Sequence, residues 1–239
     1  MKTKCEDFSF FQGYAGNEMI TNVYMEQQMN PQNYFKMEAG NRLTGITDKT
    51  AEYLFIPENI TEIASFAFAE CNRLIGVFIP KTVIHMEGAL FVNCPKLTFI
   101  DVDKKNPRYD SRYNCNAVID KQKGELVAGC RTTIIPEDIV GIGQFAFYMQ
   151  YGLKSITIPK NISYISKCVF KDCRELVDVK FSSELQEIGF CAFSGCVSLL
   201  DIVIPKKISN IEESAFESVN HIWYDGQLKE APWGAWNMN

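Results

Sequence analysis

The sequence predicts a solenoid, in which short units of similar structure stack one on the next. The first observation is a period of 23 residues: the pattern of Leu153–Leu176 is repeated from Leu176 and again from Leu199. The second is that apolar residues return at the same positions of each unit, which is typical of arrays whose units bury their apolar faces only against neighbours. The third is a proline at fixed phase, at Pro57, Pro80, Pro136 and Pro159, with Ser182 in its place in one unit.

Each unit is expected to open with a short strand, because apolar residues at alternate positions of a short run indicate a half-buried strand. The proline then ends this strand, since proline has no amide hydrogen for a sheet. The apolar columns of this part are Leu74, Leu97, Leu153, Leu176, Leu199 and Ile222; Val77, Ile100, Ile156, Val179 and Ile202; and Ile56, Ile79, Val102, Ile135, Ile158, Phe181 and Ile204.

The second part of each unit carries two further aliphatic columns and a phenylalanine column. These are Ile60, Val83, Ile139, Ile162, Leu185 and Ile208; Ile63, Met86, Ile142, Ile165, Ile188 and Ile211; and Phe68, Phe91, Phe147, Phe170, Phe193 and Phe216. We therefore expect about seven buried apolar side chains per unit, each contributing on the order of 1.5–3 kcal/mol before entropy is subtracted.

These columns resemble the BspA-like leucine-rich repeat family, whose units read roughly L-x-x-I-x-I-P, then I-x-x-I, then A-F-x-x-C. The last portion is intact at Ala67-Phe68 with Cys71 and at Ala192-Phe193 with Cys196, and other units carry altered versions. The resemblance covers about residues 51–239. It implies an α/β fold, a right-handed leucine-rich-repeat solenoid of 23-residue coils with a parallel sheet on one face. It implies no catalytic residue, because the family's motif positions are core positions.

Composition and charge exclude several classes of function. With 239 residues, 46% of them hydrophobic, the chain can bury a large core. Its net charge of −5 argues against nucleic acid and anionic membranes as partners, which would require clustered lysine and arginine. No apolar run approaches the length of about 18 residues that a membrane-spanning helix needs, and the first twenty residues contain no uninterrupted apolar segment of a secretory signal. These residues alone indicate a cytoplasmic protein, whereas the family resemblance implies a cell-surface or secreted one.

The nine cysteines are arranged by phase rather than as a disulfide framework. Six of them fall in two inward-facing columns, which are Cys71, Cys94, Cys173 and Cys196, and Cys168 and Cys191. Neighbouring coils about 4.8 Å apart leave bridging open on distance, but the odd count and the missing export signal favour buried, reduced thiols. No C-x-x-C pair occurs, and His85 and His221 lie at different phases. We therefore expect no zinc site, no Cys–His nucleophile, no catalytic residue and no cofactor.

Residues 1–50 lie before the repeats and are interpreted as an N-terminal cap, because an array must cover the open apolar end of its first coil. They are rich in aromatic residues and methionine, and a ligand surface is the alternative interpretation. A helix is expected at Ile20–Met29 and a strand at Arg42–Thr47.

The repeats are expected to span residues 51–222, and residues 223–239 are interpreted as a C-terminal cap. Trp233 and Trp236 are expected to cover Phe216 at the open end of the last coil. The alternative is that these two tryptophans anchor a partner.

One coil is longer than the others, since 33 residues rather than 23 separate Val102 from Ile135. The extra residues lie within an insertion at about residues 104–130. A β-hairpin is expected there, formed by Ala117–Asp120 and Glu125–Ala128. We expect it to project from the body, either as a binding loop or as a tolerated surface insertion.

The hairpin also predicts a cysteine pair. A turn at Gln122-Lys123 would place Asp120 opposite Glu125, Val118 opposite Val127 and Cys115 opposite Cys130. Opposed Cβ atoms lie about 4.5–5.5 Å apart, slightly more than the roughly 3.8 Å of a disulfide. Cys115 and Cys130 are therefore predicted to be the pair that bridges first under oxidising conditions, and two reduced thiols are the alternative resting state.

The predicted function is a non-enzymatic protein-interaction module of adhesion type, which presents a sheet face and the hairpin to a protein or glycan partner. The alternatives are an intracellular scaffold and an enzyme domain with an unrecognised site. An enzyme would need acids, bases or a nucleophile that converge in a deep pocket, and the outward strand positions offer no such group.

The binding residues are predicted on the outward side of the first strands. They are Tyr53, Phe55, Phe78, Phe99 and Asp101. An apolar patch of more than a few hundred Å² is rarely bare on a monomer, so we expect the aromatic residues to be covered by the N-terminal cap, by a second copy or by the ligand. The later part of the face is polar, with Thr157, Asp178, Lys180 and Asp201.

Overall fold

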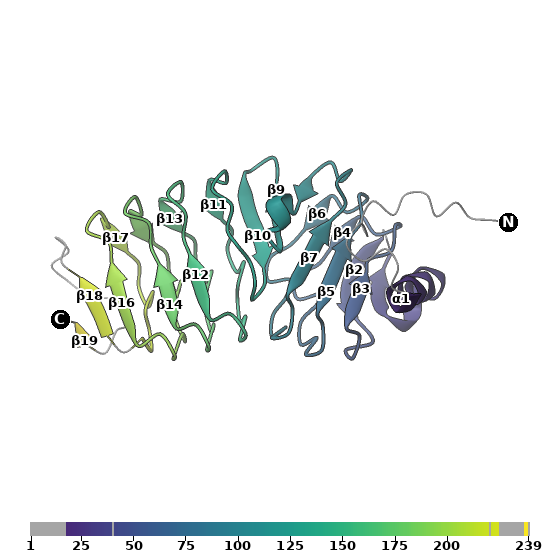
Figure 1. Ribbon diagram of the computed structural model, residues 1–239, viewed down its shortest axis with the longest axis horizontal. Helices are drawn as coiled ribbons and strands as arrows, with labels where there is room; N and C mark the ends of the chain where they lie inside the picture. The colour runs from purple at the N-terminus through teal and green to yellow at the C-terminus, as the bar shows by residue number, and fades with distance from the viewer. Residues whose placement is uncertain (1–17, 40, 220, 225–236, 239) are drawn as a thin grey trace.

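The chain forms an elongated solenoid in a computed structural model, which describes residues 18–39, 41–219, 221–224 and 237–238. About eight coils of about 23 residues stack along the long axis, with α1 (Glu18–Met29) at one end and β18 (His221–Tyr224) at the other (Figure 1). The described helical structure is confined to α1 (Glu18–Met29) and two short 3-10 helices, Pro31–Asn33 and Arg112–Asn114. The predicted solenoid is confirmed.

A first row of parallel strands runs along the molecule, one strand to most coils. Its strands are β3 (Tyr53–Phe55), β5 (Gly76–Ile79), β7 (Phe99–Val102), β12 (Ser155–Thr157), β14 (Asp178–Lys180), β16 (Asp201–Ile204), β18 (His221–Tyr224) and β19 (Asn237–Met238). The row is divided into the sheets β3-β5-β7, β12-β14 and β16-β18-β19. Val77 and Ile100 are paired in register and buried, as the columns predict, and buried Leu54 pairs with Val77.

A second row consists mainly of shorter strands, from the part of each coil that follows the proline. Its strands are β1 (Phe35–Glu38), β2 (Arg42–Ile46), β4 (Glu62–Ile63), β6 (His85–Met86), β8 (Tyr109–Asp110), β9 (Ala117–Asp120), β10 (Glu125–Gly129), β11 (Gly141–Ile142), β13 (Tyr164–Ile165), β15 (Glu187–Ile188) and β17 (Asn210–Ile211). They form the sheets β1-β2-β4-β6, β11-β10-β9-β8 and β13-β15-β17. α1 and β2 confirm the helix and the strand predicted before the repeats.

The phenylalanine column forms the centre of the core. Phe68 and Phe91 stack with ring centroids 5.0 Å apart, and Phe147, Phe170 and Phe193 stack at 5.1 Å intervals. The turns that carry these rings repeatedly place non-glycine residues at positive φ. Backbone hydrogen bonds between coils hold this unfavourable conformation, such as Phe147 N–H to the Val169 carbonyl at 3.0 Å.

The predicted hairpin is present as β9 and β10, but the expectation that it projects from the body is wrong. β10 pairs antiparallel with β9 and parallel with β11, so the hairpin is built into the second row. Val118, Ile119 and Leu126 are completely buried. Only the turn at residues 121–123 is exposed.

The hairpin register differs from the prediction because β10 contains a β-bulge at Val127. Asp120 pairs with Glu125 as predicted, but Val118 pairs with Ala128 rather than with Val127. A bulge adds one residue to one strand and reverses the facing of the residues beyond it, so Leu126 and Ala128 face different parts of the core. The predicted opposition of Cys115 and Cys130 is wrong for the same reason.

Two hydrophobic cores meet at this hairpin. Ala117, Ile119 and Leu126 belong to the core of the C-terminal coils, whereas Val118 and Ala128 belong to the core of the N-terminal coils. The hairpin therefore forms a wall with both faces buried, which explains why four successive residues of β9 are all buried.

The last coil is three residues shorter than the period. The prediction placed Ile222 in the column of Leu199, but β18 pairs Ile222 with Ile202. The chain passes from Val219 almost directly into β18, where His221 N–H donates to the Leu200 carbonyl at 3.0 Å. The predicted lid residues Trp233 and Trp236 lie outside the described residues.

Candidate functional site

The outward side of the first row begins with an aromatic ladder, which α1 covers. Phe55 and Phe78 stack with centroids 4.4 Å apart and interplanar angle 9°, and both are buried. Tyr24 of α1 packs edge-on against Phe55 at 5.5 Å. Of the three predicted covers for this patch, the structure contains the N-terminal cap.

A glutamine fixes α1 on the ladder. Gln27 is completely buried, its Nε2 donates to the Tyr53 carbonyl at 2.8 Å, and its Oε1 accepts from Phe55 N–H at 2.8 Å. Gln28 adds a bond to the Phe55 carbonyl at 3.1 Å. α1 is therefore joined to the strand edge by hydrogen bonds as well as by apolar contact.

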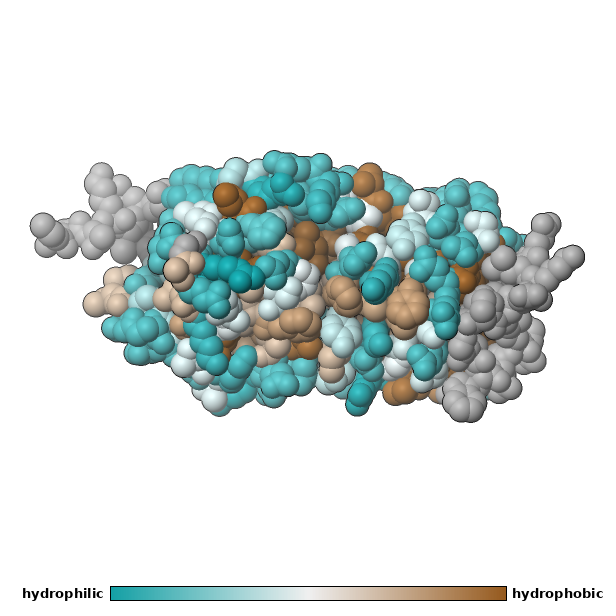
Figure 2. Space-filling model, turned by 180° about the vertical axis from the view of Figure 1, so that it is seen from behind, coloured by the Kyte–Doolittle hydropathy of each residue, from teal (hydrophilic) through white to brown (hydrophobic). Residues whose placement is uncertain are grey.

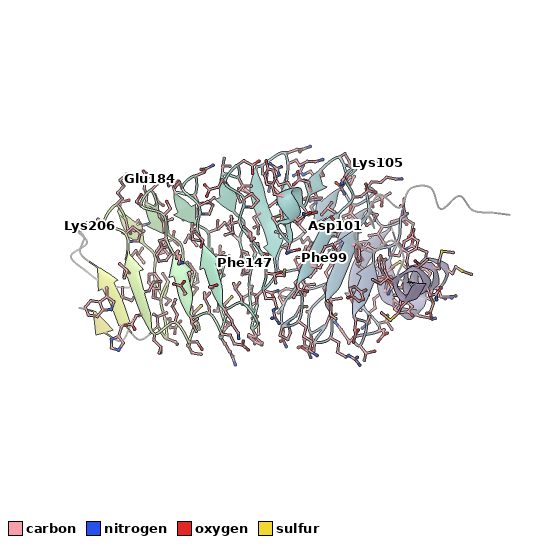
Figure 3. The ribbon with its side chains drawn as sticks, in the orientation of Figure 1. Phe99, Asp101, Lys105, Phe147, Glu184 and Lys206 are labelled. Carbon is pink, nitrogen blue, oxygen red and sulfur yellow. The ribbon has the colours of Figure 1, made fainter. Side chains whose placement is uncertain are left out.

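The five predicted binding residues lie together, but their accessibility differs. Phe99 and Asp101 both project from β7 (Figure 3) and are half-buried; the ring of Phe99 lies 5.2 Å from that of Phe78. Burial raises the pKa of Asp101, whose Oδ1 accepts a hydrogen bond from Ser111 Oγ at 2.8 Å. α1 encloses Phe55 and Phe78, and a binding role for the group stays a prediction.

In the C-terminal half no described residue covers the outward side, and two columns of exposed side chains continue there. One column contains Ser155, Asp178, Asp201 and His221, and the other contains Thr157, Lys180, Val203 and Trp223. Trp223 is 47% exposed and Val203 is 71% exposed. The sequence interpretation did not identify Trp223 as an outward residue. The last coil is three residues shorter than the period, so counting in steps of 23 residues assigns Trp223 to the wrong position of the coil.

A cleft of about 650 Å³ lies where the hairpin separates the coils of β6 and β11. One wall is formed by Ser65, Phe66 and residues 85–89, and the other by the hairpin and residues 143–145. Seen from behind, hydrophobic residues gather along the middle of the surface while the upper edge is hydrophilic (Figure 2). The cleft has hydrophobic and hydrophilic parts, because Phe66 is 52% exposed and charged side chains also line the cleft.

Two carboxylates of the cleft are held in the ionised form. Burial alone would raise the pKa of Asp120, but bonds from Arg108 Nη2 at 2.7 Å and from backbone amides of the turn hold it below its usual value. The Ser65 amide, Arg42 and the Ser65 hydroxyl lower the pKa of Glu87 to about 2. Neither carboxylate has the raised pKa of a general acid.

The thiols of the main cysteine column join neighbouring coils. Sγ of Cys94, Cys173 and Cys196 donates to the phenylalanine carbonyl of the preceding coil at 3.0–3.1 Å. Gln150 stands in this column at the longer coil, and its Nε2 reaches the Phe91 carbonyl at 2.5 Å. The Gln150 side chain thus makes the bond to a phenylalanine carbonyl that a cysteine thiol makes in the other coils.

All eight cysteines of the described residues are buried and unpaired. Burial raises the pKa of Cys196 to about 12 and that of Cys115 to about 11, and it also raises the pKa of Cys130. Such thiols are poor nucleophiles, because the thiolate is the reactive form. The Cys115–Cys130 disulfide under oxidising conditions stays a prediction.

Cys71 differs from the other cysteines of its column. A hydrogen bond from the Cys94 thiol and the nearby Lys49 ammonium lower its pKa, and Lys49 Nζ lies 3.9 Å from its Sγ. The side chain is nevertheless buried. Within the described ranges no group of three or more histidine, cysteine or acidic residues is arranged to hold a metal ion, and no described helix is long and apolar enough to cross a membrane.

Stacked coils with parallel strands, a buried leucine column and a buried phenylalanine column define a leucine-rich-repeat solenoid. The sequence model of the BspA type leucine-rich repeat region matches residues 47–118 and 128–225 in six copies, and the chain belongs to this family. The family is generally non-enzymatic. The unmatched residues between the two ranges, 119–127, comprise the second half of β9, the turn and the first three residues of β10.

Solved structures show the same fold. A leucine rich cell surface protein from Faecalibacterium prausnitzii A2-165 is 23% identical with a TM-score of 0.56, covering 74% of this chain and 54% of its own. The pneumococcal vaccine antigen PcpA is 16% identical with a TM-score of 0.57, covering 74% of this chain and 57% of its own. This chain thus spans somewhat more than half the length of either structure. A search of the curated proteins found no match.

Proposed function

We propose that the chain is a non-enzymatic protein-interaction module that binds a protein partner through the outward face of β12, β14, β16 and β18. The observation that carries the proposal is the double column of exposed side chains on this face. The names of the two similar structures, a cell surface protein and a vaccine antigen, favour an adhesion-type role over an intracellular scaffold.

The register of the strands fixes the spacing of this face. Ser155 lies beside Asp178, and Thr157 beside Lys180, while in the next sheet Val203 lies beside Trp223. The backbone of a solenoid is rigid along each coil, so a partner meets these side chains in one arrangement. Such preorganisation reduces the entropy lost on binding.

Val203 and Trp223 form the anchor of the proposed face. Trp223 Nε1 donates to Asp201 Oδ1 at 3.3 Å, which orients the indole on the sheet. Tryptophan is enriched among the residues that dominate binding energy, and a surrounding polar rim excludes water from such contacts. Asp201 and the residues of β14 supply this rim.

The test compares capture of proteins from the native source by the wild-type chain and by substituted chains. We expect Val203→Asp and Trp223→Ala to reduce retention of a specific partner by about tenfold or more. Val177→Asp is the matched control, because Val177 is similarly exposed but precedes β14 and lies outside the two columns. The substituted chains must keep the thermal stability of the wild type, so that the loss of partner retention cannot be due to unfolding. If Val203→Asp retains every partner of the wild type, the face is not the binding surface.

A further inference from the structure

The cleft contains two backbone groups that lack the partners their equivalents have in other coils. In the preceding pair of coils, the Ile63 carbonyl accepts Glu87 N–H at 3.0 Å. Met86 has the position of Ile63 one coil later, but the corresponding donor, Gly143 N–H, bonds to the Leu126 carbonyl of the hairpin at 2.8 Å. Among the described residues, none donates a hydrogen bond to the Met86 carbonyl, which is the first of the two groups.

The second group is the backbone amide of Ala89. Phe66 and Cys168 hold the same position in other coils, also at positive φ. Phe66 N–H donates to the Ala89 carbonyl at 3.1 Å, and Cys168 N–H to the Phe190 carbonyl at 3.0 Å. Within the described part of the chain, Ala89 N–H has no acceptor. Met86 and Ala89 are 8% and 4% exposed, and buried backbone groups are nearly always paired in proteins. A ligand of the cleft should therefore both donate and accept hydrogen bonds.

Two aromatic side chains line the same cleft. Phe66 is 52% exposed, the highest value among the described phenylalanines. Phe145 is half-buried, and its ring lies 3.7 Å from the position that a Cβ of Gly88 would take. Because Gly88 has no side chain, nothing at that position covers the Phe145 ring. The cleft thus offers aromatic surface together with the two backbone groups.

The charges that line the cleft are balanced. Glu87 is paired with an arginine of β2, and Asp120 is paired with Arg108 at 2.7 Å. The remaining lysine and glutamate of the lining, Lys123 and Glu125, have opposite charges. Charge complementarity therefore favours neither an acidic nor a basic ligand, and a neutral polar ligand fits this balance.

We infer that the cleft binds a neutral carbohydrate. Each sugar hydroxyl is both a donor and an acceptor, so the hydroxyls of a sugar serve the Met86 carbonyl and the Ala89 amide together. The apolar C–H face of a sugar ring packs on the rings of Phe66 and Phe145. The cleft volume of about 650 Å³ lies within the range of about 300–1,000 Å³ that is typical of small-molecule sites. A peptide strand cannot add to β6, because the Tyr109 hydroxyl already accepts Met86 N–H at 3.0 Å. This site is separate from the outward face of the first row.

Amide NMR of the full chain, titrated with neutral trisaccharides, tests the inference. The probes are maltotriose, cellotriose, mannotriose and triacetylchitotriose. We expect at least one of them to shift the signals of Gly88 and Ala89 until saturation. Phe66→Ala should weaken that binding by about tenfold, because an aromatic contact is lost. Phe190→Ala is the matched control and should retain binding, because Phe190 is an exposed phenylalanine outside the cleft. The inference is overturned if no probe shifts these signals, or if Phe66→Ala binds as the wild type does.

Two further comparisons test the site and the ligand class. Gly88→Phe should cover the Phe145 ring and abolish the shift at Ala89, whereas Gly88→Ala should retain binding, since its Cβ makes only ordinary contacts. If Gly88→Phe does not fold, the comparison of Phe66→Ala with Phe190→Ala still decides the matter. Trigalacturonate and trilysine are the charged probes. If either of them binds the cleft more tightly than every neutral trisaccharide, the ligand is not a neutral carbohydrate.

Discussion

Glu87 shows how one side chain connects three coils. It belongs to the coil of β6, accepts from the Ser65 amide and hydroxyl in the preceding coil, and pairs with Arg42 of β2. These contacts lower its pKa from 4.5 to about 2. Because the folded-state pKa is lower than the unfolded one, the carboxylate stabilises the fold above about pH 4.5 and loses this contribution as the pH falls toward 2.

We therefore predict that Glu87→Gln lowers the free energy of unfolding by about 1 kcal/mol at pH 7, a value reduced from the full pKa shift because the side chain is about one-third exposed. The difference between variant and wild type should shrink as the pH falls from 4.5 to 2. Urea unfolding at pH 7 and pH 2.5 measures it. Glu175→Gln, at an exposed position, is the control and should change neither value. A difference that persists at pH 2.5 would contradict the assignment.

At the residue scale, the sequence identifies the inward columns well, because burial at a fixed phase leaves a periodic signal. The sequence does not reveal the β-bulge at Val127 or the hydrogen bond of Gln150 to the neighbouring coil. Both depend on the junction at the hairpin, which does not follow the 23-residue period. Trp223 was missed for a related reason: its phase depends on the shortened last coil, which only the pairing with β16 reveals.

At the element scale, α1 determines which part of the outward face is accessible. The sequence predicts both the helix and an aromatic patch that requires a cover, but the choice among cap, second copy and ligand depends on tertiary contacts. Those contacts are the two hydrogen bonds of Gln27 to β3 and the ring of Tyr24 against Phe55. Propensity and periodicity contain no information about them.

We predict that Gln27→Ala loosens α1 without unfolding the coils. The substitution leaves the Tyr53 carbonyl and the Phe55 amide without their partner, and an unsatisfied buried group costs about 1–3 kcal/mol. Hydrogen exchange should accelerate in α1 and at Phe55, while residues 153–219 exchange as in the wild type. Gln28→Ala removes one bond at 3.1 Å and should have a smaller effect. Equal acceleration throughout the chain would show that α1 is not a separate unit.

At the scale of the whole molecule, the sequence predicts one continuous array, and the structure shows two cores joined by a hairpin wall. The hairpin was predicted from its turn and its apolar runs, but its burial was not. Because every residue of β9 is buried, buried and exposed residues do not alternate along the strand. Without knowledge of the second core, such a segment resembles a surface insertion in the sequence. The junction also creates the cleft beside β6, which no single unit of the sequence encodes.

The wall leads to a prediction about cooperativity. Val118 and Ile119 are adjacent and completely buried, but Val118 faces the N-terminal core and Ile119 the C-terminal core. Because one strand contributes to both cores, loss of packing on either side should destabilise the whole array. We expect Val118→Ala and Ile119→Ala each to lower the free energy of unfolding by about 2–4 kcal/mol.

All three tryptophans lie in the C-terminal part of the chain, beginning at Trp223. Tryptophan fluorescence therefore reports on the C-terminal coils, whereas far-UV circular dichroism reports on the entire array. If the cores unfold together, Val118→Ala shifts the urea midpoint equally by both methods, although it lies in the distant core. Val177→Ala at an exposed position should change the free energy by less than about 0.5 kcal/mol. A fluorescence midpoint that Val118→Ala leaves unchanged would mean that the wall separates two independently folding units.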